Sequence, residues 1–220
     1  MKYVKILGLV ATAAMALMAF LAAGTASATV LCREAKTSGC TNDYAAKQRI
    51  VATTEQQTTG ILETTGGAIL DTCVGSEIKG EIGEKGTGGA SAAVSGPLDP
   101  IVVDEGGKET SGLEWGTCSR PTKTLKVGTF EVHHIAGTDN GTLTATGGIE
   151  VTINIIFGTC VFGTGEALDV GKITGGKPAT INTEKAVIPK RSGSPVCPTH
   201  ALWDAQFTVT TPGEAWVSAS

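Results

Sequence analysis

Three histidines are the residues of this chain best suited to acid–base or metal chemistry: His133, His134 and His200. The strand-like run that begins at Thr129 would place Glu131 and His133 on one face, because side chains two positions apart share a face of a β-strand. A carboxylate beside a histidine can orient the imidazole ring or help to hold a metal. One candidate function is therefore a secreted hydrolase that uses His133 or His200 with a carboxylate.

Other sequence patterns that carry chemistry are missing from the chain. No G-x-S-x-G pentapeptide marks a serine nucleophile, and no D-x-[DN]-x-[DN]-G loop marks a calcium site. The glycine-rich stretch 83–89 lacks the lysine–serine pair and the helix of a phosphate-binding loop. The histidines also lack the close ligand spacing of a metal motif. We therefore assign no catalytic, cofactor-binding or metal residues, and we expect no cofactor.

The six cysteines indicate cross-linking rather than catalysis. No C-x-x-C pair occurs, which argues against a zinc knuckle or a thioredoxin-type redox site. An even number of cysteines in an exported chain is typical of disulfides, here three. Six cysteines allow fifteen connectivities, and their count does not choose among them. The residues concerned are Cys32, Cys40, Cys73, Cys118, Cys160 and Cys197.

An internal similarity favours one connectivity. The run GGAILDTCV at 66–74 resembles two pieces of the later sequence, GGI at 147–149 and GTCV at 158–161. After each of these regions the chain reaches a second cysteine, Cys118 or Cys197. An F-x-V run is also present in each half, at 130–132 and at 207–209. Two related halves, 49–136 and 137–220, would each contain one bridge. The alternative is that Gly/Thr-rich β sequences resemble one another by composition alone. The repeat predicts the pairs Cys73–Cys118 and Cys160–Cys197, which leaves Cys32–Cys40 in the N-terminal segment 29–48.

Short alternating runs separated by turn residues predict an all-β domain over 49–220. The clearest run is 149–155, in which isoleucine or valine alternates with polar residues. Asn140-Gly141 favours a type I′ hairpin turn or a related tight turn, because both residues accept a positive φ, and 205–211 also has the pattern of a strand. Only 42–49 has the pattern of a short helix. We predict a single antiparallel β-sandwich stapled by disulfides.

The first 28 residues have the pattern of a cleaved signal peptide. Lys2 and Lys5 precede an uncharged run over 6–23, and the run ends near Ala26-Ser27-Ala28. A retained membrane anchor is the alternative, because the run approaches the length that spans a bilayer. A lipid anchor at Cys32 fits less well, since Leu31 is not the small residue that bacterial lipoproteins place before the lipidated cysteine. We expect a secreted or envelope-associated protein with no membrane span after cleavage.

The charge of the chain argues against a nucleic-acid partner. Lysine and arginine number 17 against 21 acidic residues, and removal of Lys2 and Lys5 would leave 15 against 21, a formal charge of −6. Nucleic-acid binding needs a basic patch that displaces counterions. No stretch of the sequence has the Lys/Arg cluster that holds a protein on an anionic membrane surface.

Parts of the chain resemble uncharacterised exported proteins of high-GC actinobacteria. The resemblance rests on Ala28-Thr29-Val30-Leu31-Cys32, on Thr72-Cys73-Val74-Gly75-Ser76, and on Cys197-Pro198 followed by Trp203, Phe207, Val209 and Pro212. It implies an extracytoplasmic β domain and supplies no catalytic residues.

The function expected from the sequence is a non-enzymatic binding or structural module with an unknown extracellular or cell-envelope partner. The hydrolase based on Glu131, His133 and His200 is the alternative. A third possibility is an inhibitor-like loop between Cys32 and Cys40.

Overall fold

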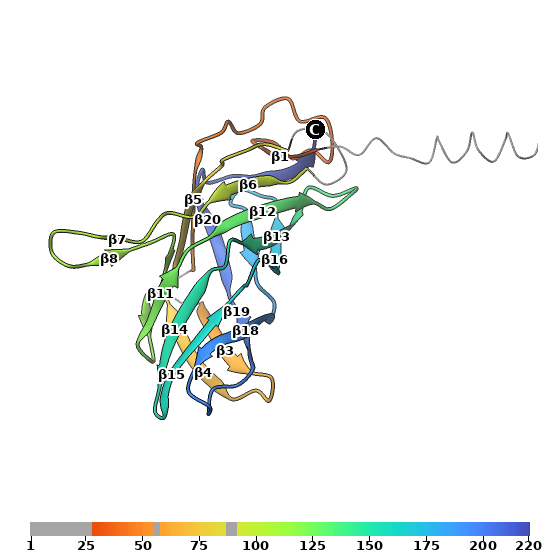
Figure 1. Cartoon of the computed structure of the whole chain (residues 1–220). Helices are drawn as coiled ribbons and strands as arrows, with labels where there is room; N and C mark the ends of the chain where they lie inside the picture. The colour runs from red at the N-terminus through yellow and green to blue at the C-terminus, as the bar shows by residue number, and fades with distance from the viewer. Residues whose placement is uncertain (1–27, 55–57, 87–91) are drawn as a thin grey trace, which may run out of the picture.

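The computed structural model describes residues 28–54, 58–86 and 92–220, and in this part of the chain it contains strands and no helices (Figure 1). The all-β fold class is thereby confirmed. Nearly all of the predicted signal peptide, and residues 87–89 of the glycine-rich loop, lie outside the described residues. Among the described residues, no helix has the length and apolar character needed to cross a bilayer.

Two large antiparallel sheets form the molecule. The first has nine strands, in the order β6 (Val94–Pro97), β12 (Thr129–His134), β13 (Gly141–Thr146), β16 (Ala167–Thr174), β17 (Thr180–Asn182), β20 (Gln206–Thr211), β2 (Arg49–Thr53), β5 (Glu77–Glu81) and β9 (Leu113–Glu114). Isolated bridges join Gly80 to Leu98 and Glu84 to Ser95. These bridges link β5 to the β6 edge, so this sheet curls into a nearly closed barrel.

The second sheet has eight strands and forms a half-barrel, in the lower part of Figure 1. Its order is β10 (Thr117–Cys118), β4 (Ile69–Val74), β3 (Thr59–Thr64), β19 (His200–Asp204), β18 (Ala186–Gly193), β15 (Gly158–Gly163), β14 (Glu150–Ile155) and β11 (Thr122–Lys126). The run predicted at 149–155 forms β14, with Ile153 buried in the core and Asn154 exposed. The alternation places its apolar side chains inward, as the period of a strand requires.

Two small ribbons complete the fold. Strand β1 (Thr29–Cys32) pairs with β21 (Trp216–Ala219), which joins the two ends of the described chain. Strands β7 (Val102–Val103) and β8 (Glu109–Thr110) form a hairpin that projects to the side in Figure 1. Near the first ribbon, the hydroxyl of Tyr44 donates a hydrogen bond of 2.8 Å to the carbonyl of Glu214. The N-terminal segment is therefore packed against the β domain.

All three disulfides have the predicted partners. Cys32 is bonded to Cys40, Cys73 to Cys118 and Cys160 to Cys197, and no described cysteine is free. The 45-residue and 37-residue bridges both staple the eight-stranded sheet, because Cys73 lies on β4 beside β10 and Cys160 lies on β15 beside β18.

The two related halves stay a prediction, and the path of the chain can be compared between them. In 49–136 the chain starts in the nine-stranded sheet (β2), crosses to the other sheet (β3, β4), returns (β5, β6, β9), crosses again (β10, β11) and ends at β12. In 137–220 it takes a similar route through β13, then β14 and β15, then β16 and β17, then β18 and β19, and then β20. Strand β21 follows and lies outside both large sheets. The β7–β8 hairpin and β9 are additions to the first half.

Two local predictions were wrong. Residues 42–49 contain an isolated bridge and a turn, with Lys47 at a φ of 67°, instead of a helix. The β12–β13 hairpin forms, but its turn has Gly137 at a φ of 76°, and Gly141 is the first residue of β13. A side chain at Gly141 would lie 2.9 Å from the carbonyl oxygen of His133. Gly141 therefore permits a close approach of two strands rather than a positive φ.

Candidate functional site

The predicted Glu131–His133 pair forms, on an open strand face. Nε2 of His133 lies 3.5 Å from Oε2 of Glu131 on β12, and the two side chains are 38% and 40% exposed. Such a pair gains little from its charges, because solvent screens it. The structure thus brings Glu131 and His133 together without burying them.

The other two histidines lie apart from this pair. His200 is exposed on β19, in the other sheet. His134 faces away from His133 on β12, and its Nε2 lies 2.7 Å from the carbonyl oxygen of Thr138. The hydrolase alternative therefore has one exposed Glu–His pair, and His200 does not lie on the same sheet.

The predicted inhibitor-like loop is held by its own contacts. The guanidinium of Arg33 stacks on the ring of Tyr44 at 4.3 Å from its centroid, and Lys36 pairs with Glu34 at 3.0 Å. Burial raises the pKa of Tyr44, and the positive charge of Arg33 opposes that rise. Arg33 thus packs on the molecule instead of extending from it.

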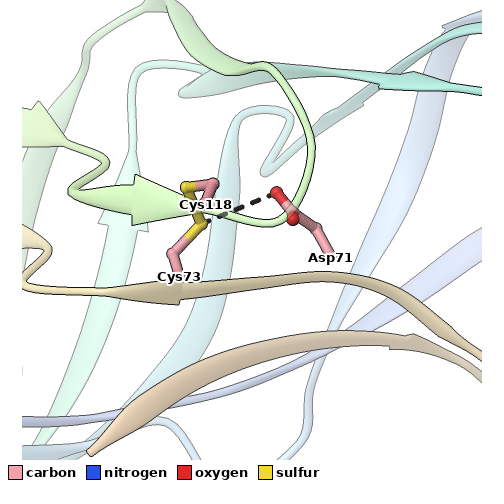
Figure 2. A group of neighbouring side chains, drawn as sticks. All are labelled: Asp71, Cys73 and Cys118. Carbon is pink, nitrogen blue, oxygen red and sulfur yellow. Dashed lines mark hydrogen bonds between the residues drawn. A yellow bond between two sulfur atoms is a disulfide. The ribbon is translucent and has the colours of Figure 1, made fainter. Parts of the chain in front are cut away.

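Asp71, Cys73 and Cys118 form the one described group whose atoms are close enough to hold a metal ion (Figure 2). The two sulfur atoms are bonded to each other, so neither cysteine offers a thiolate. The dashed line in Figure 2 joins Sγ of Cys73 to Oδ2 of Asp71 over 3.5 Å. Because a disulfide sulfur carries no hydrogen, this is a packing contact rather than a hydrogen bond.

The carboxylate of Asp71 is buried and accepts four hydrogen bonds. The residue is 2% exposed, and its donors come from its own strand and from the segment that follows Cys118. They are the backbone N–H of Thr72 (2.8 Å), the hydroxyl of Ser119 (2.7 Å), the backbone N–H of Arg120 (3.0 Å) and the hydroxyl of Thr122. These bonds offset the cost of burying a charge. Asp71 therefore anchors the chain between β10 and β11.

Among the described residues, an apolar cavity lies between the two sheets. Its volume is about 140 Å³, and its lining is almost entirely apolar. Strands of both sheets contribute, with Leu62, Val151, Phe162 and Trp203 from one and Phe130 and Ile181 from the other. Of the described residues in the wall, Asp71 alone is ionisable, and its oxygens already have partners.

Incomplete filling of the core explains the cavity. Ten apolar side chains pack on the core but remain partly exposed. Seven of the ten also line the cavity: Ile50, Leu62, Ile78, Phe130, Ile149, Val151 and Trp203. Of the ten aromatic residues in the sequence, two (Tyr3 and Phe20) precede residue 28 and Phe157 is 75% exposed, so at most seven can fill the interior. The interior lacks the large side chains that would fill it.

Two tryptophans, Trp115 and Trp203, line the cavity. The ring centroids of Trp115 and Trp203 are 6.1 Å apart, and those of Trp203 and Phe207 are 6.0 Å apart in an edge-to-face arrangement. The indole N–H of Trp115 donates a hydrogen bond of 3.0 Å to the hydroxyl of Thr124, which donates to the carbonyl of Leu113. The position of Trp115 is thus set by the neighbouring strand β11.

A polar cleft adjoins the apolar cavity at Trp115. Its volume is about 370 Å³, and Thr53, Thr54, Glu77 and Glu114 line it together with Trp115. Burial lowers the pKa of Lys79, but its hydrogen bonds to Glu114 and Glu77 outweigh this and raise the pKa above its usual 10.5. Trp115 thus lines both the apolar cavity and the polar cleft.

The sequence prediction missed Asp71 and Trp115 as site residues. The alternation in 69–74 places Asp71 on the same face as the buried Cys73, and that signal was available. By their spacing, Trp203, Phe207 and Val209 would share one face of a single terminal strand. In the structure Trp203 lies on β19 and Phe207 on β20, because the chain crosses between the sheets at Ala205. Nothing local indicated that crossing.

No protein-family model, curated protein or solved structure matches this chain. The resemblance to exported actinobacterial proteins stays a prediction.

Proposed function

We propose that the protein is a non-enzymatic binding module, secreted or associated with the cell envelope, whose apolar cavity takes up a small apolar molecule or the apolar part of an amphiphile. The observation that carries this proposal is the cavity of about 140 Å³ that both sheets line with apolar side chains.

The free-energy cost of such a cavity supports a role for it. Protein interiors are normally packed as densely as organic crystals, with few voids larger than a water molecule. A cavity left by truncating side chains costs about 24 cal/mol per Å³, so a volume of 140 Å³ corresponds to about 3 kcal/mol. That is a large fraction of the stability of a typical domain. A bound ligand would recover it.

The size and chemistry of the cavity indicate the ligand class. An apolar cavity of roughly 150 Å³ stays dry and takes up benzene-sized molecules. The four hydrogen bonds to Asp71 occupy the ionisable group in the wall, so apolar contact supplies the binding free energy. The cleft beyond Trp115 offers Thr53, Thr54 and two carboxylates to a polar group on the same ligand.

The three disulfides support the expected compartment. Disulfides persist in oxidising spaces and are rare in the cytosol. With every described cysteine paired, the chain has the cross-linking expected of an exported protein.

Titration of the oxidised protein with benzene tests the proposal. Because Trp115 and Trp203 line the cavity, we expect their fluorescence emission to shift as benzene binds. At ten times its dissociation constant, a ligand that binds only the folded state adds about 1.4 kcal/mol to the free energy of unfolding. The absence of both effects would overturn the proposal.

Replacing one of two buried alanines with leucine locates the binding site. Ala145→Leu extends a cavity-lining side chain into the empty space and should abolish the benzene response while leaving stability unchanged or higher. Ala52 is fully buried on the same sheet but does not line the cavity, so Ala52→Leu should cost about 1 to 3 kcal/mol by overpacking. Undiminished benzene binding by Ala145→Leu would place the ligand elsewhere.

A further inference from the structure

Two turns lie at the lower end of the eight-stranded sheet in Figure 1, and both carry exposed apolar residues. Ile156 and Phe157, in the β14–β15 turn, are 79% and 75% exposed. Val196, in the turn between β18 and β19, is 56% exposed. We call these three residues the apolar tip. Burying large apolar side chains is favourable, so three of them on neighbouring turns form a candidate contact surface.

The apolar tip is held in place by covalent and hydrogen bonds. The hydroxyl of Ser194 donates to the carbonyl of Phe157 at 3.3 Å, and the backbone N–H of Ser194 donates to the carbonyl of Thr159 at 3.0 Å. The Cys160–Cys197 disulfide joins the two turns close to these contacts. A partner would therefore meet a preformed surface, with little loss of conformational entropy on binding.

The charges beside the apolar tip are positive. The ammonium group of Lys190 donates a hydrogen bond of 2.8 Å to the carbonyl of Ser194, which places this cation at the tip. Residues 151–165 contain no charged side chain, and 186–203 contain Lys190, Arg191 and His200 but no carboxylate. The whole chain, in contrast, has a formal charge of −4. Lys190 thus places a positive charge at the tip of an acidic protein, whereas the guanidinium of Arg191 lies beside Gly165, past the far end of β15.

The shape of the tip favours a lipid surface over a folded protein partner. Two neighbouring turns present few side chains, whereas a stable protein interface involves roughly 20 to 30 residues on each side. A bilayer accepts a small convex apolar group, and its anionic headgroups attract adjacent lysine and arginine. We propose that the apolar tip docks on an anionic lipid bilayer, with Ile156 and Phe157 entering the interface and Lys190 facing the headgroups. This docking does not depend on a ligand in the cavity.

Co-sedimentation with lipid vesicles tests the docking. The oxidised protein would be mixed with vesicles of phosphatidylcholine and phosphatidylglycerol in equal parts, and with vesicles of phosphatidylcholine alone. We expect it to sediment with the mixed vesicles and more weakly with the neutral ones. The double variant Ile156→Ser/Phe157→Ser should bind the mixed vesicles at least roughly tenfold more weakly. Lys190→Gln should bind them about fivefold more weakly.

The β7–β8 hairpin provides the matched control. Val102 and Val103 are also exposed apolar neighbours, at 53% and 60%, but the residues around them, 99–109, include four carboxylates and one lysine. Val102→Ser/Val103→Ser should therefore leave vesicle binding unchanged. Equal losses in the two double variants, or no binding of the unaltered protein to the mixed vesicles, would overturn the proposal. Dimerisation that depends on Phe157 would also overturn it, because a second copy would then cover the tip.

Discussion

Asp71 on β4 accepts a hydrogen bond from the hydroxyl of Thr122 on β11, although these strands lie near opposite ends of the eight-stranded sheet. Strand β4 is next to the edge strand β10, and β11 is the other edge. The short segment between β10 and β11 brings the two edges together, and the carboxylate of Asp71 holds this segment at Ser119, Arg120 and Thr122. One buried carboxylate thus links the two edges of the curled sheet that encloses the cavity.

Asp71→Asn should destabilise the protein by about 3 kcal/mol or more. The amide has about the size of the carboxylate, but it carries no charge, and its NH₂ group cannot accept from the donors that face it. Losing charge-assisted bonds and leaving buried donors unpaired each cost about 1 to 3 kcal/mol. Urea denaturation of the oxidised protein measures the change.

Asp169→Asn is the control for that substitution. Asp169 is exposed and accepts one side-chain hydrogen bond, from Thr144 at 2.6 Å, which the amide oxygen can also accept. We expect a change within about 0.5 kcal/mol, as for most surface substitutions. Equal stability of the Asp71 and Asp169 variants would contradict the structural role of Asp71.

The two long disulfides should contribute more stability than the short one. Closing a loop restricts the unfolded chain, and the loop-closure relation assigns about 4 kcal/mol to each of the 45-residue and 37-residue loops and about 2.5 kcal/mol to the 8-residue loop. The double variants Cys73→Ala/Cys118→Ala and Cys160→Ala/Cys197→Ala should therefore lose more than Cys32→Ala/Cys40→Ala. Urea denaturation of the three variants gives the order, and a larger loss for the Cys32–Cys40 variant would contradict it.

The ion pairs of Lys79 should weaken at alkaline pH. Because Glu114 and Glu77 raise the pKa of Lys79 above 10.5 in spite of its burial, the folded state holds this proton more tightly than the unfolded chain does. The resulting stability is fully present below about pH 10.5 and is lost as the pH rises through the folded-state pKa.

Comparing the unaltered protein with the variant Lys79→Gln isolates the contribution of these ion pairs to stability. The difference in free energy of unfolding between the unaltered protein and the variant should be largest near neutral pH and should shrink above about pH 10.5. Burial also raises the pKa of Tyr44, but this contribution is common to both proteins and cancels in the difference. A difference that stays constant from neutral to strongly alkaline pH would show that the ion pairs do not stabilise the fold.

The sequence by itself determined several of the strands and the disulfide partners. Alternation of apolar and polar residues acts within a single strand, so β14 and β20 could be predicted where they occur. The similar runs around Cys73 and Cys160 predicted both long bridges, and the structure contains them. These features depend on local patterns and on the spacing of similar residues, and the amino-acid sequence alone contains this information.

Only the tertiary structure decided where the candidate sites lie. Asp71 and Thr122, 51 residues apart, meet because the eight-stranded sheet curls, and Trp115 and Trp203 meet because strands far apart in the chain enclose one interior. The apolar tip and Lys190 come together through two turns that a disulfide joins. Strand register and sheet curvature result from many distant backbone pairings at once, and no short stretch of sequence contains that information.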